Sequence, residues 1–370
     1  MIYRPLGKTG LRVSQLGFGA MRLPMVGQGE MARVDRDKAI PMIQRAFAAG
    51  VNYIDSAVGY CNQDSQVAVG EALKGWREKV IVSTKNPYYD EDETKWWGNL
   101  ENSLQRLGVE YIDVYHHHGV NVKNFEEKVL PRVSKWMRKA KEQGLVKHIA
   151  CSFHDNNAGL KRILEEGYVS VITLQYNMLD RQLEKGIAYA HEKGVGIVVM
   201  GPVGGGRLGV ESEVLGSMVP AVQRVPELAL RFVLSNPHVA VALSGMSTLQ
   251  QVEENVATAG DAVTLSAEDK RAIEEHLGRL KGMSDLYCTG CNYCKPCPRN
   301  VDIPGVLAKY NLGRVWGLWA MAQQQYGGMV KKGSGADQCG QCAECEAKCP
   351  QHLHICEELK KAHEALSKKE

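Results

Sequence analysis

The sequence predicts an α/β chain in two parts, a (β/α)8 barrel followed by a small, mostly helical domain rich in cysteine. Short apolar runs with many β-branched residues alternate with amphipathic stretches, which is the rhythm of parallel strands joined by helices. Nine of the eleven cysteines follow residue 287. A chain of 370 residues accommodates a barrel of about 250 residues and one further small domain. We place the domains at 1–283 and 284–370.

The predicted strands follow one another at regular intervals. They lie at 15–20, 51–55, 80–84, 111–116, 146–151, 171–174, 195–200 and 239–243. Helix-like segments such as 38–49 and 125–142 separate them. A doubly wound open sheet shows the same alternation and is the alternative, because alternation does not reveal whether the sheet closes.

After a predicted helix at 266–281, the composition changes to Cys, Pro and Gly. A helical stretch is expected at 303–325, followed by a Gly-rich turn at 332–337. This change in composition marks the expected domain boundary.

Charge and hydropathy limit the expected partners. Lys and Arg number 45 against 42 Asp and Glu, a net charge of +3, without a long run of like charge, so neither nucleic acid nor an anionic membrane is expected. The first residues lack the apolar run of a signal peptide, and no apolar stretch reaches the ~18 residues of a membrane span. We expect a cytoplasmic protein, in which clustered cysteines indicate metal or redox sites.

Four polar residues fall at the carboxyl ends of predicted strands, where a barrel of this kind carries its reactive groups. They are Asp55, Tyr60, Lys85 and His118. A phenol can give a proton to a developing alkoxide if a nearby ammonium stabilises the phenolate. Asp55 would hold Lys85 charged, and His118 could hydrogen-bond a substrate carbonyl. A strand-end Asp and Lys also often form a plain salt bridge, so these residues alone do not distinguish a catalytic site from a structural ion pair.

The stretches around these residues resemble the aldo-keto reductases over about residues 1–280. They are, in order, LGKTGLRVSQLGFGAMRLP, NYIDSAVGY, IVSTK, LGVEYIDVYHHH, LQYN and VEENV. The resemblance implies a soluble reductase that binds a nicotinamide dinucleotide without a Rossmann domain. It further implies a catalytic tetrad of Tyr60, His118, Lys85 and Asp55.

The same resemblance implies cofactor contacts. Ser152 and Gln175 match positions that grip the carboxamide of nicotinamide. The other matched positions lie after the first barrel strand and at the adenosine phosphate end, and they are Gly19, Ala20, Met21, Ser244, Gly245, Thr248, Gln251, Glu254 and Asn255.

Two departures from the family pattern concern the cofactor. The basic residues that usually bind the 2′-phosphate of NADP fall on Gly245 and Gln251, which carry no charge, so NADH is expected to bind at least as well as NADPH. The aromatic residue that usually stacks on nicotinamide falls on Met200, and the Asn beside the carboxamide-binding serine is Phe153. Nicotinamide is therefore expected to be held differently, and a flavin is kept as an alternative.

The motif YHHHG places three histidines in a row. Strand alternation puts His116 and His118 on one face and His117 on the other. We interpret His116 as a hydrogen-bonded interior side chain. Cys61, directly after Tyr60, is interpreted as a small buried side chain rather than a nucleophile.

Two runs of four cysteines, each closed by Cys-Pro, define the second part. The second run has the C-x2-C-x2-C-x3-C-P spacing of bacterial ferredoxins, in which three thiolates hold one 4Fe-4S cluster and the last reaches the other cluster. By that rule, one cluster takes Cys288, Cys291, Cys294 and Cys349 and the other takes Cys339, Cys342, Cys345 and Cys297. The pattern predicts a ferredoxin-like iron-sulfur domain with two 4Fe-4S clusters.

Zinc held by paired CxxC knuckles is the alternative, although runs ending in Cys-Pro are atypical of zinc ribbons. The first run has two residues instead of three before its last cysteine, which makes Cys297 the least secure ligand. Cys151 and Cys356 lie outside both runs and are interpreted as structural thiols. His352 and His354 are interpreted as surface side chains.

The combined patterns predict an oxidoreductase that interconverts a carbonyl and an alcohol of a small molecule with NAD(H) or NADP(H). The clusters would transfer electrons or stabilise the fold. Hydride transfer moves two electrons and a 4Fe-4S cluster moves one, so coupling them needs a flavin or a substrate that tolerates radicals. The alternatives are a flavin-dependent or ferredoxin-coupled reductase with a redox partner protein, and a non-catalytic electron-transfer or partner-binding protein. The intact tetrad argues against the last.

Overall fold

The computed structural model describes two compact units. The described residues are 1–206, 208–209, 212–219, 222, 224–260, 265–285, 288, 294–349 and 353–368. The first unit comprises Met1–Gly205 and Ala229–Thr264, and the second comprises Gly206–Leu228 and Leu265–Glu370. The sequence-based boundary at residue 283 stays a prediction.

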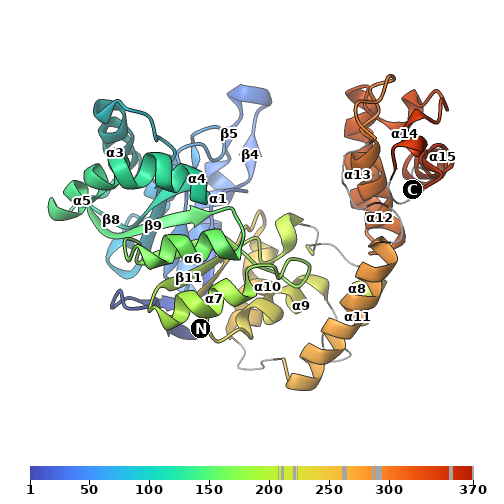
Figure 1. Cartoon of the computed structure of the whole chain (residues 1–370). Helices are drawn as coiled ribbons and strands as arrows, with labels where there is room; N and C mark the ends of the chain where they lie inside the picture. Colours follow the sequence, from blue (N-terminus) through green and yellow to red (C-terminus); the bar gives the residue numbers. More distant parts are fainter. Residues whose placement is uncertain are drawn as a thin grey trace. The chain divides into compact units, whose positions relative to one another are not determined.

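The strands of the first unit form a closed parallel barrel (Figure 1). The order around the barrel is β10-β11-β12-β3-β6-β7-β8-β9, and β9 pairs with β10 to close it. The strands are β3 (Leu16–Gly19), β6 (Tyr53–Asp55), β7 (Ile81–Asn86), β8 (Ile112–Val120), β9 (Val146–Phe153), β10 (Val171–Gln175), β11 (Gly196–Met200) and β12 (Val241–Ser244). The barrel prediction is confirmed, and closure excludes the doubly wound sheet.

Helices between the strands bury one apolar side. In α3 (Glu93–Leu107), Trp96, Leu100 and Leu107 are buried at helical spacing. The Asp92 side chain caps the start of this helix, and Gly108, at φ +62°, ends it. The other helices of this part are α1 (Arg36–Ala48), α2 (Ser65–Ala72), α4 (Val122–Asn124), α5 (Ser134–Glu142), α6 (Asn157–Glu165), α7 (Glu184–Glu192), α9 (Val225–Leu234) and α10 (Leu249–Gly260).

The segment 125–142 differs from the single helix that the sequence predicts. It begins as a π-helix, η3 (Phe125–Val133), and continues as α5. Pro131 lies within the π-helical part and has no N–H to give to the preceding turn, which favours the departure from α-helical hydrogen bonding.

Two short hairpins precede the first barrel helix, and the sequence analysis did not predict them. Strands β1 (Tyr3–Pro5) and β2 (Arg12–Ser14) pair antiparallel, and Leu6 and Val13 join an apolar core with residues of several barrel strands. Strands β4 (Met25–Val26) and β5 (Arg33–Val34) form the second hairpin, with the turn η1 (Gly29–Met31) between them.

The described residues of the second unit are mostly helical, as predicted. Its elements are α8 (Glu213–Gly216), α11 (Ala267–Asp285), α12 (Ile303–Arg314), α13 (Trp319–Lys331), η5 (Ala336–Gln338), α14 (Glu344–Ala347) and α15 (Ile355–Leu366). The helical stretch predicted at 303–325 is confirmed as two helices, because the chain turns between α12 and α13, where Gly317 has φ +67°. No helix among the described residues is long and apolar enough to span a membrane.

Candidate functional site

Neighbouring barrel strands bring together the four residues of the expected tetrad. Asp55 ends β6, and Tyr60 lies in the loop that follows it. Lys85 belongs to β7 and His118 to β8. Because β6, β7 and β8 are adjacent and parallel, residues far apart in the sequence meet at the carboxyl end of the barrel.

The centre of this site is a buried ion pair. Lys85 Nζ donates to Asp55 Oδ2 at 2.5 Å and to the Ser56 carbonyl at 2.8 Å. Lys85 and Asp55 are 2% and 4% exposed. Burial opposes the ammonium, but Asp55 and Tyr60 outweigh it, so the pKa of Lys85 is raised above its ordinary value. Lys85 therefore remains charged at neutral pH.

Tyr60 lies against this ion pair. The Lys85 Nζ atom is 4.8 Å from the centroid of the Tyr60 ring, and the ring of His118 meets it edge-on at 6.2 Å. Burial raises the pKa of Tyr60, and the nearby Lys85 ammonium opposes that change without cancelling it. Tyr60 is therefore a protonated phenol beside a cation.

The loop after Tyr60 has an unusual backbone. Cys61, Asn62 and Gln63 have φ values of 51°, 53° and 67°, in the left-handed region. Non-glycine residues rarely adopt this conformation, and such strain is often found at functional sites. Cys61 is partly buried, and burial raises the pKa of its thiol, which agrees with its interpretation as an unreactive side chain.

The three histidines of β8 are uncharged and buried to different depths. Burial, followed by the charge of Lys85, lowers the pKa of His118 to about 4 and that of His116 to about 3. His117 Nε2 lies 2.9 Å from the Tyr168 hydroxyl, away from the barrel interior that His116 faces, which confirms the predicted alternation. Strand β8 extends to Val120, beyond the predicted end at residue 116, with a register shift after His117.

The positions expected to hold nicotinamide lie on the next strands around the barrel. Ser152 is in β9, Gln175 ends β10 and Met200 ends β11. The Ser152 hydroxyl accepts the Gly119 N–H at 2.8 Å, just after His118. At Gly201, φ +64°, a side chain would approach the Gln175 amide oxygen to 2.6 Å, so glycine keeps this amide accessible.

Phe153 and the first barrel strand complete the surroundings of these positions. Phe153 is fully buried. Gly19 ends β3, and the Ala20 N–H donates to the Asp55 carbonyl at 2.8 Å, which ties this segment to β6. Met21 is 58% exposed.

The expected adenosine phosphate end lies between β12 and α10. Asn255 Nδ2 donates to the Ser244 hydroxyl at 3.0 Å. The Thr248 hydroxyl accepts the Gln251 N–H, and the Gln251 side chain accepts the Ser247 N–H at 2.8 Å. Gln251 therefore closes the first turn of α10, and Glu254 on the same helix accepts from Gln250. The positive end of the helix dipole of α10 is available for an anion.

Sequence reasoning missed Arg22 and Ser83. A side chain at Gly245 would meet the Arg22 side chain at 3.5 Å, and the Ser247 hydroxyl donates to the Arg22 carbonyl. The stem of Arg22 makes this contact, while its guanidinium donates to the Gly205 carbonyl at 3.1 Å. No local pattern in the sequence reveals either contact. Ser83 donates to Asp55, and its spacing of two residues from Lys85, which places both on one face of β7, was the available signal.

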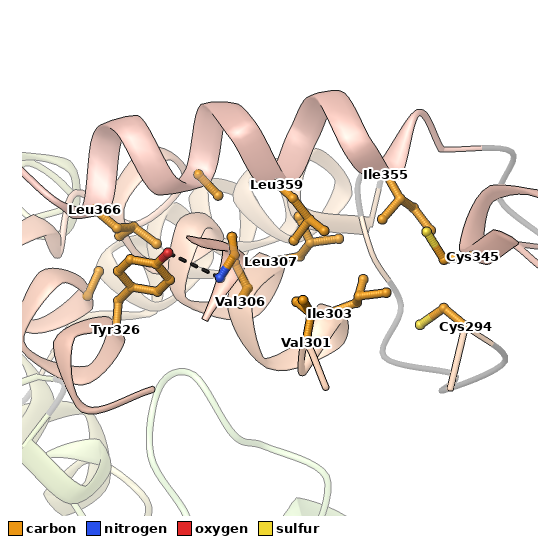
Figure 2. Packing of buried hydrophobic residues seen from close by; sticks show 13 residues of the cluster. Cys294, Val301, Ile303, Val306, Leu307, Tyr326, Cys345, Ile355, Leu359 and Leu366 are labelled. Atoms are coloured by element: carbon orange, nitrogen blue, oxygen red, sulfur yellow. Dashed lines mark hydrogen bonds between the residues drawn. The ribbon is translucent and has the colours of Figure 1, made fainter. Parts of the chain in front are cut away.

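Most of the described cysteines of the second unit lie around one small core. Figure 2 shows Cys294 and Cys345 at the same end of that core, with Val306, Leu307 and Leu359 along it. The Tyr326 hydroxyl accepts the Ala336 N–H at 3.2 Å, which joins α13 to η5. Partly buried cysteines pack against the same core, and they are Cys288, Cys297, Cys339, Cys349 and Cys356.

These thiols fit an iron-sulfur cluster chemically. In the second run, Gln341 and Ala343 have φ values of 54° and 57°, which turn the short loops on both sides of the exposed Cys342. Successive left-handed and right-handed residues direct backbone N–H groups toward an anion. Among the described residues, no group of three or more His, Cys, Asp and Glu side chains is arranged to hold a metal ion. The thiolates of a 4Fe-4S cluster need not converge in this way, because each binds a different iron.

The remaining cysteines and histidines singled out in the sequence lie in different surroundings. Cys291 and His352 lie outside the described residues. Cys151 is fully buried, and His354 is exposed at the start of α15. Cys356 lies closer to the second cysteine run than expected, because its thiol faces that of Cys345.

Comparison with known proteins gives two family matches. The model of the aldo/keto reductase family matches residues 15–218, more than half of the chain. A model described as a 4Fe-4S dicluster domain matches residues 287–354.

Curated relatives match about three quarters of the chain. The chain is 26% identical to an uncharacterized oxidoreductase of Bacillus subtilis over 308 residues, covering 74% of the chain and 95% of the relative. It is 28% identical to the L-galactose dehydrogenase of Arabidopsis thaliana, covering 73% and 92%. It is also 28% identical to the NADH-specific methylglyoxal reductase of Escherichia coli, covering 73% and 97%.

Solved structures give the same result. The holo form of an aldo-keto reductase from Bacillus halodurans superposes with a TM-score of 0.65 at 29% identity, covering 75% of this chain and 96% of that one. A crystal structure of PA4992 from Pseudomonas aeruginosa, which carries the same family name, gives a TM-score of 0.57 at 26% identity, covering 70% of this chain and 94% of that one.

Proposed function

The chain belongs to the aldo/keto reductase family, and from this premise we propose that its barrel interconverts a carbonyl and an alcohol by hydride transfer with a nicotinamide dinucleotide. The chain is an oxidoreductase that joins this barrel to a 4Fe-4S dicluster domain. The observation that carries the proposal is the buried contact of Tyr60, Lys85 and Asp55 at the barrel mouth, with the ring of His118 against that of Tyr60.

Each residue of this group has a separate role in the proposed reaction. Tyr60 keeps its proton because burial raises its pKa, and it donates that proton to the developing alkoxide. Lys85 then stabilises the phenolate, and Asp55 keeps Lys85 in place. The neutral His118 hydrogen-bonds the substrate carbonyl and orients it.

The nicotinamide would supply or accept the hydride when bound. Ser152 and Gln175 support this assignment, since both offer polar groups at the ends of neighbouring strands. At the phosphate end, the N-terminus of α10 and Arg22 offer partial and full positive charge.

We further propose that the eight cysteines of the two runs hold two 4Fe-4S clusters. Seven of them are described, six of these are wholly or partly buried in one unit, and the dicluster model spans both runs. Clusters of this kind exchange single electrons with a redox partner protein or stabilise a small fold.

Isotope transfer tests the proposed hydride step. Anaerobically purified protein is given methylglyoxal as the probe, with NADH carrying deuterium on one or the other face of the nicotinamide ring. Direct transfer places the deuterium of one face in the product alcohol. A reduced flavin exchanges its transferred hydrogen with water, so an unlabelled product together with a flavin absorption spectrum would instead favour the flavin-dependent reductase.

A further inference from the structure

A polar layer lies beneath the tetrad, inside the barrel. Ser83 Oγ donates to Asp55 Oδ1 at 2.7 Å, while Lys85 holds the other carboxylate oxygen. Ser83 and His116 are fully buried, and Thr173 is 1% exposed. Buried polar groups in a barrel interior destabilise the fold unless they are hydrogen-bonded, so each of these side chains is expected to have a specific partner.

Hydrogen-bond partners fix the tautomer of His116. Its Nδ1 lies 3.3 Å from the Thr84 carbonyl, which only accepts, so Nδ1 carries the hydrogen. Its Nε2 then accepts from the Thr173 hydroxyl at 2.8 Å. Because burial lowers the pKa of His116 to about 3, the ring remains neutral and keeps this single N–H.

The orientation of His116 decides the direction of the Ser83 hydroxyl. Nδ1–H of His116 also faces Ser83 Oγ, at 3.5 Å. A nitrogen that carries hydrogen cannot accept one, so the Ser83 hydrogen points to Asp55 instead. Both carboxylate oxygens of Asp55 therefore have a fixed donor.

We propose that Ser83 is a positioning residue that holds the Asp55 carboxylate against Lys85, and that Thr173 and His116 set the direction of its hydroxyl. The inference rests on the proposed function, in which Lys85 and Asp55 act on Tyr60. Tyr53 also lies near Asp55 as a buried neutral phenol. Within the described part of the chain, the titratable groups near Tyr60 also include Lys85, the neutral His118 and His154, whose pKa is lowered by burial and then by the Lys85 charge.

The inference predicts a change in Tyr60 without any need for turnover. Loss of the Ser83 hydroxyl leaves more negative charge on Asp55 and draws Lys85 away from Tyr60. Both changes disfavour the phenolate, so the pKa of Tyr60 should rise by about half a unit in Ser83→Ala. Thr173→Val removes the donor to Nε2 and leaves His116 oriented by the Thr84 carbonyl at Nδ1. The ring is then held less firmly beside Ser83, so the pKa of Tyr60 should rise by a smaller amount.

The measurement uses a fluorinated tyrosine at residue 60, which ionises at lower pH than tyrosine, and follows its titration by ¹⁹F NMR in the full-length chain. Ser14→Ala is the matched control, because Ser14 is also fully buried and donates to the Leu16 carbonyl at 2.6 Å, in the β1–β2 hairpin. Ser83→Ala and Ser14→Ala should lose similar thermal stability, but only the first should move the titration.

Equal titrations in wild type, Ser83→Ala and Thr173→Val would overturn the positioning role. If Ser83→Ala does not fold, the isosteric Thr173→Val still decides, because it leaves Ser83 in place. If the Tyr60 titration changes as predicted but the protein does not reduce carbonyls, the proposed function is rejected and the positioning role of Ser83 stands. Where turnover is found, Ser83→Ala should lower kcat about tenfold with little change in KM, and Ser83→Thr should recover most of the loss.

Discussion

The candidate sites at the carboxyl end of the barrel (the barrel mouth) and in the second unit (the cysteine unit) are formed in opposite ways. The mouth takes Asp55, Lys85 and His118 from three strands, and each side chain is fixed by contacts with distant parts of the chain. The cysteines come from two short runs, and the small core around them is made by three helices and their connections. The mouth is thus organised by the fold around it, whereas the cysteine unit is expected to depend on the clusters that it binds.

This difference predicts that removal of iron affects the two regions unequally. Intact protein purified anaerobically should contain about eight irons per chain, four for each cluster. Chelation should unfold the second unit, because a small core rarely holds such a domain without its metal, and should leave the barrel folded. Hydrogen exchange should show lost protection in α12 and α15 and unchanged protection in β7.

Two outcomes would contradict this prediction. Stoichiometric zinc without acid-labile sulfide would reject the cluster assignment. Full protection of α12 and α15 after iron removal would show that the clusters do not stabilise this unit.

Tyr60→Phe should produce the next largest effect, confined to the mouth. The ring keeps its packing and loses only the proton, so turnover should fall by about 10²-fold or more while folding and cofactor binding are retained. Lys85→Met should also lower turnover, because it removes the ammonium that stabilises the phenolate. Tyr176→Phe is the control, since it removes a buried hydroxyl bonded to Glu184 at 2.8 Å. Full activity of Tyr60→Phe on a verified carbonyl substrate would reject the tetrad mechanism.

Mild acid should weaken the barrel through its row of histidines. The pKa values of His116, His117 and His118 are lowered to about 3, about 3 and about 4, mainly by burial, against about 6.5 in the unfolded chain. Below pH ~6.5 the unfolded state binds protons that the native state does not, so stability should fall by about 1.4 kcal/mol per pH unit for each histidine. The loss should continue down to the folded-state pKa values.

Urea unfolding of the barrel at pH 7 and pH 5 measures this effect. His117→Gln should reduce the slope, because one fewer histidine takes up a proton on unfolding. His354→Gln is the control outside the barrel, since His354 is exposed at the start of α15. An unchanged free energy of unfolding between the two pH values would show that these histidines are not held neutral.

The smallest effect concerns the choice of nucleotide. NADH should bind at least as well as NADPH, because Gly245 and Gln251 bring no charge to the expected 2′-phosphate site. Arg22 lies against Gly245. Arg22→Gln should therefore weaken the binding of NADPH about threefold and the binding of NADH less, as expected for an exposed charge. Fluorescence titration gives both affinities. A strong NADPH preference that survives this change would show that the segment from Ser244 to Asn255 is wrongly assigned.

The local sequence pattern was sufficient to predict the features that depend only on the spacing of residues along the chain. Strand alternation fixed which histidines of β8 share a face, and the βα rhythm located every barrel strand. The cysteine runs identified the second unit in the same way, because the short and regular spacing of their cysteines is itself the pattern of a 4Fe-4S domain.

The sequence by itself determined the order of the elements, the cysteine runs and the residues at the strand ends, because these depend on periodicity and short spacing. Only the tertiary structure decided that the sheet closes, that Ser83 and His116 lie under Asp55, and that Arg22 reaches Gly245. It also divided the helical stretch predicted at 303–325 into two helices, because a glycine turn lets α12 and α13 pack around one core. Such contacts join residues on separate elements, and their distances are set by the packing of the whole barrel or core, which no local pattern encodes.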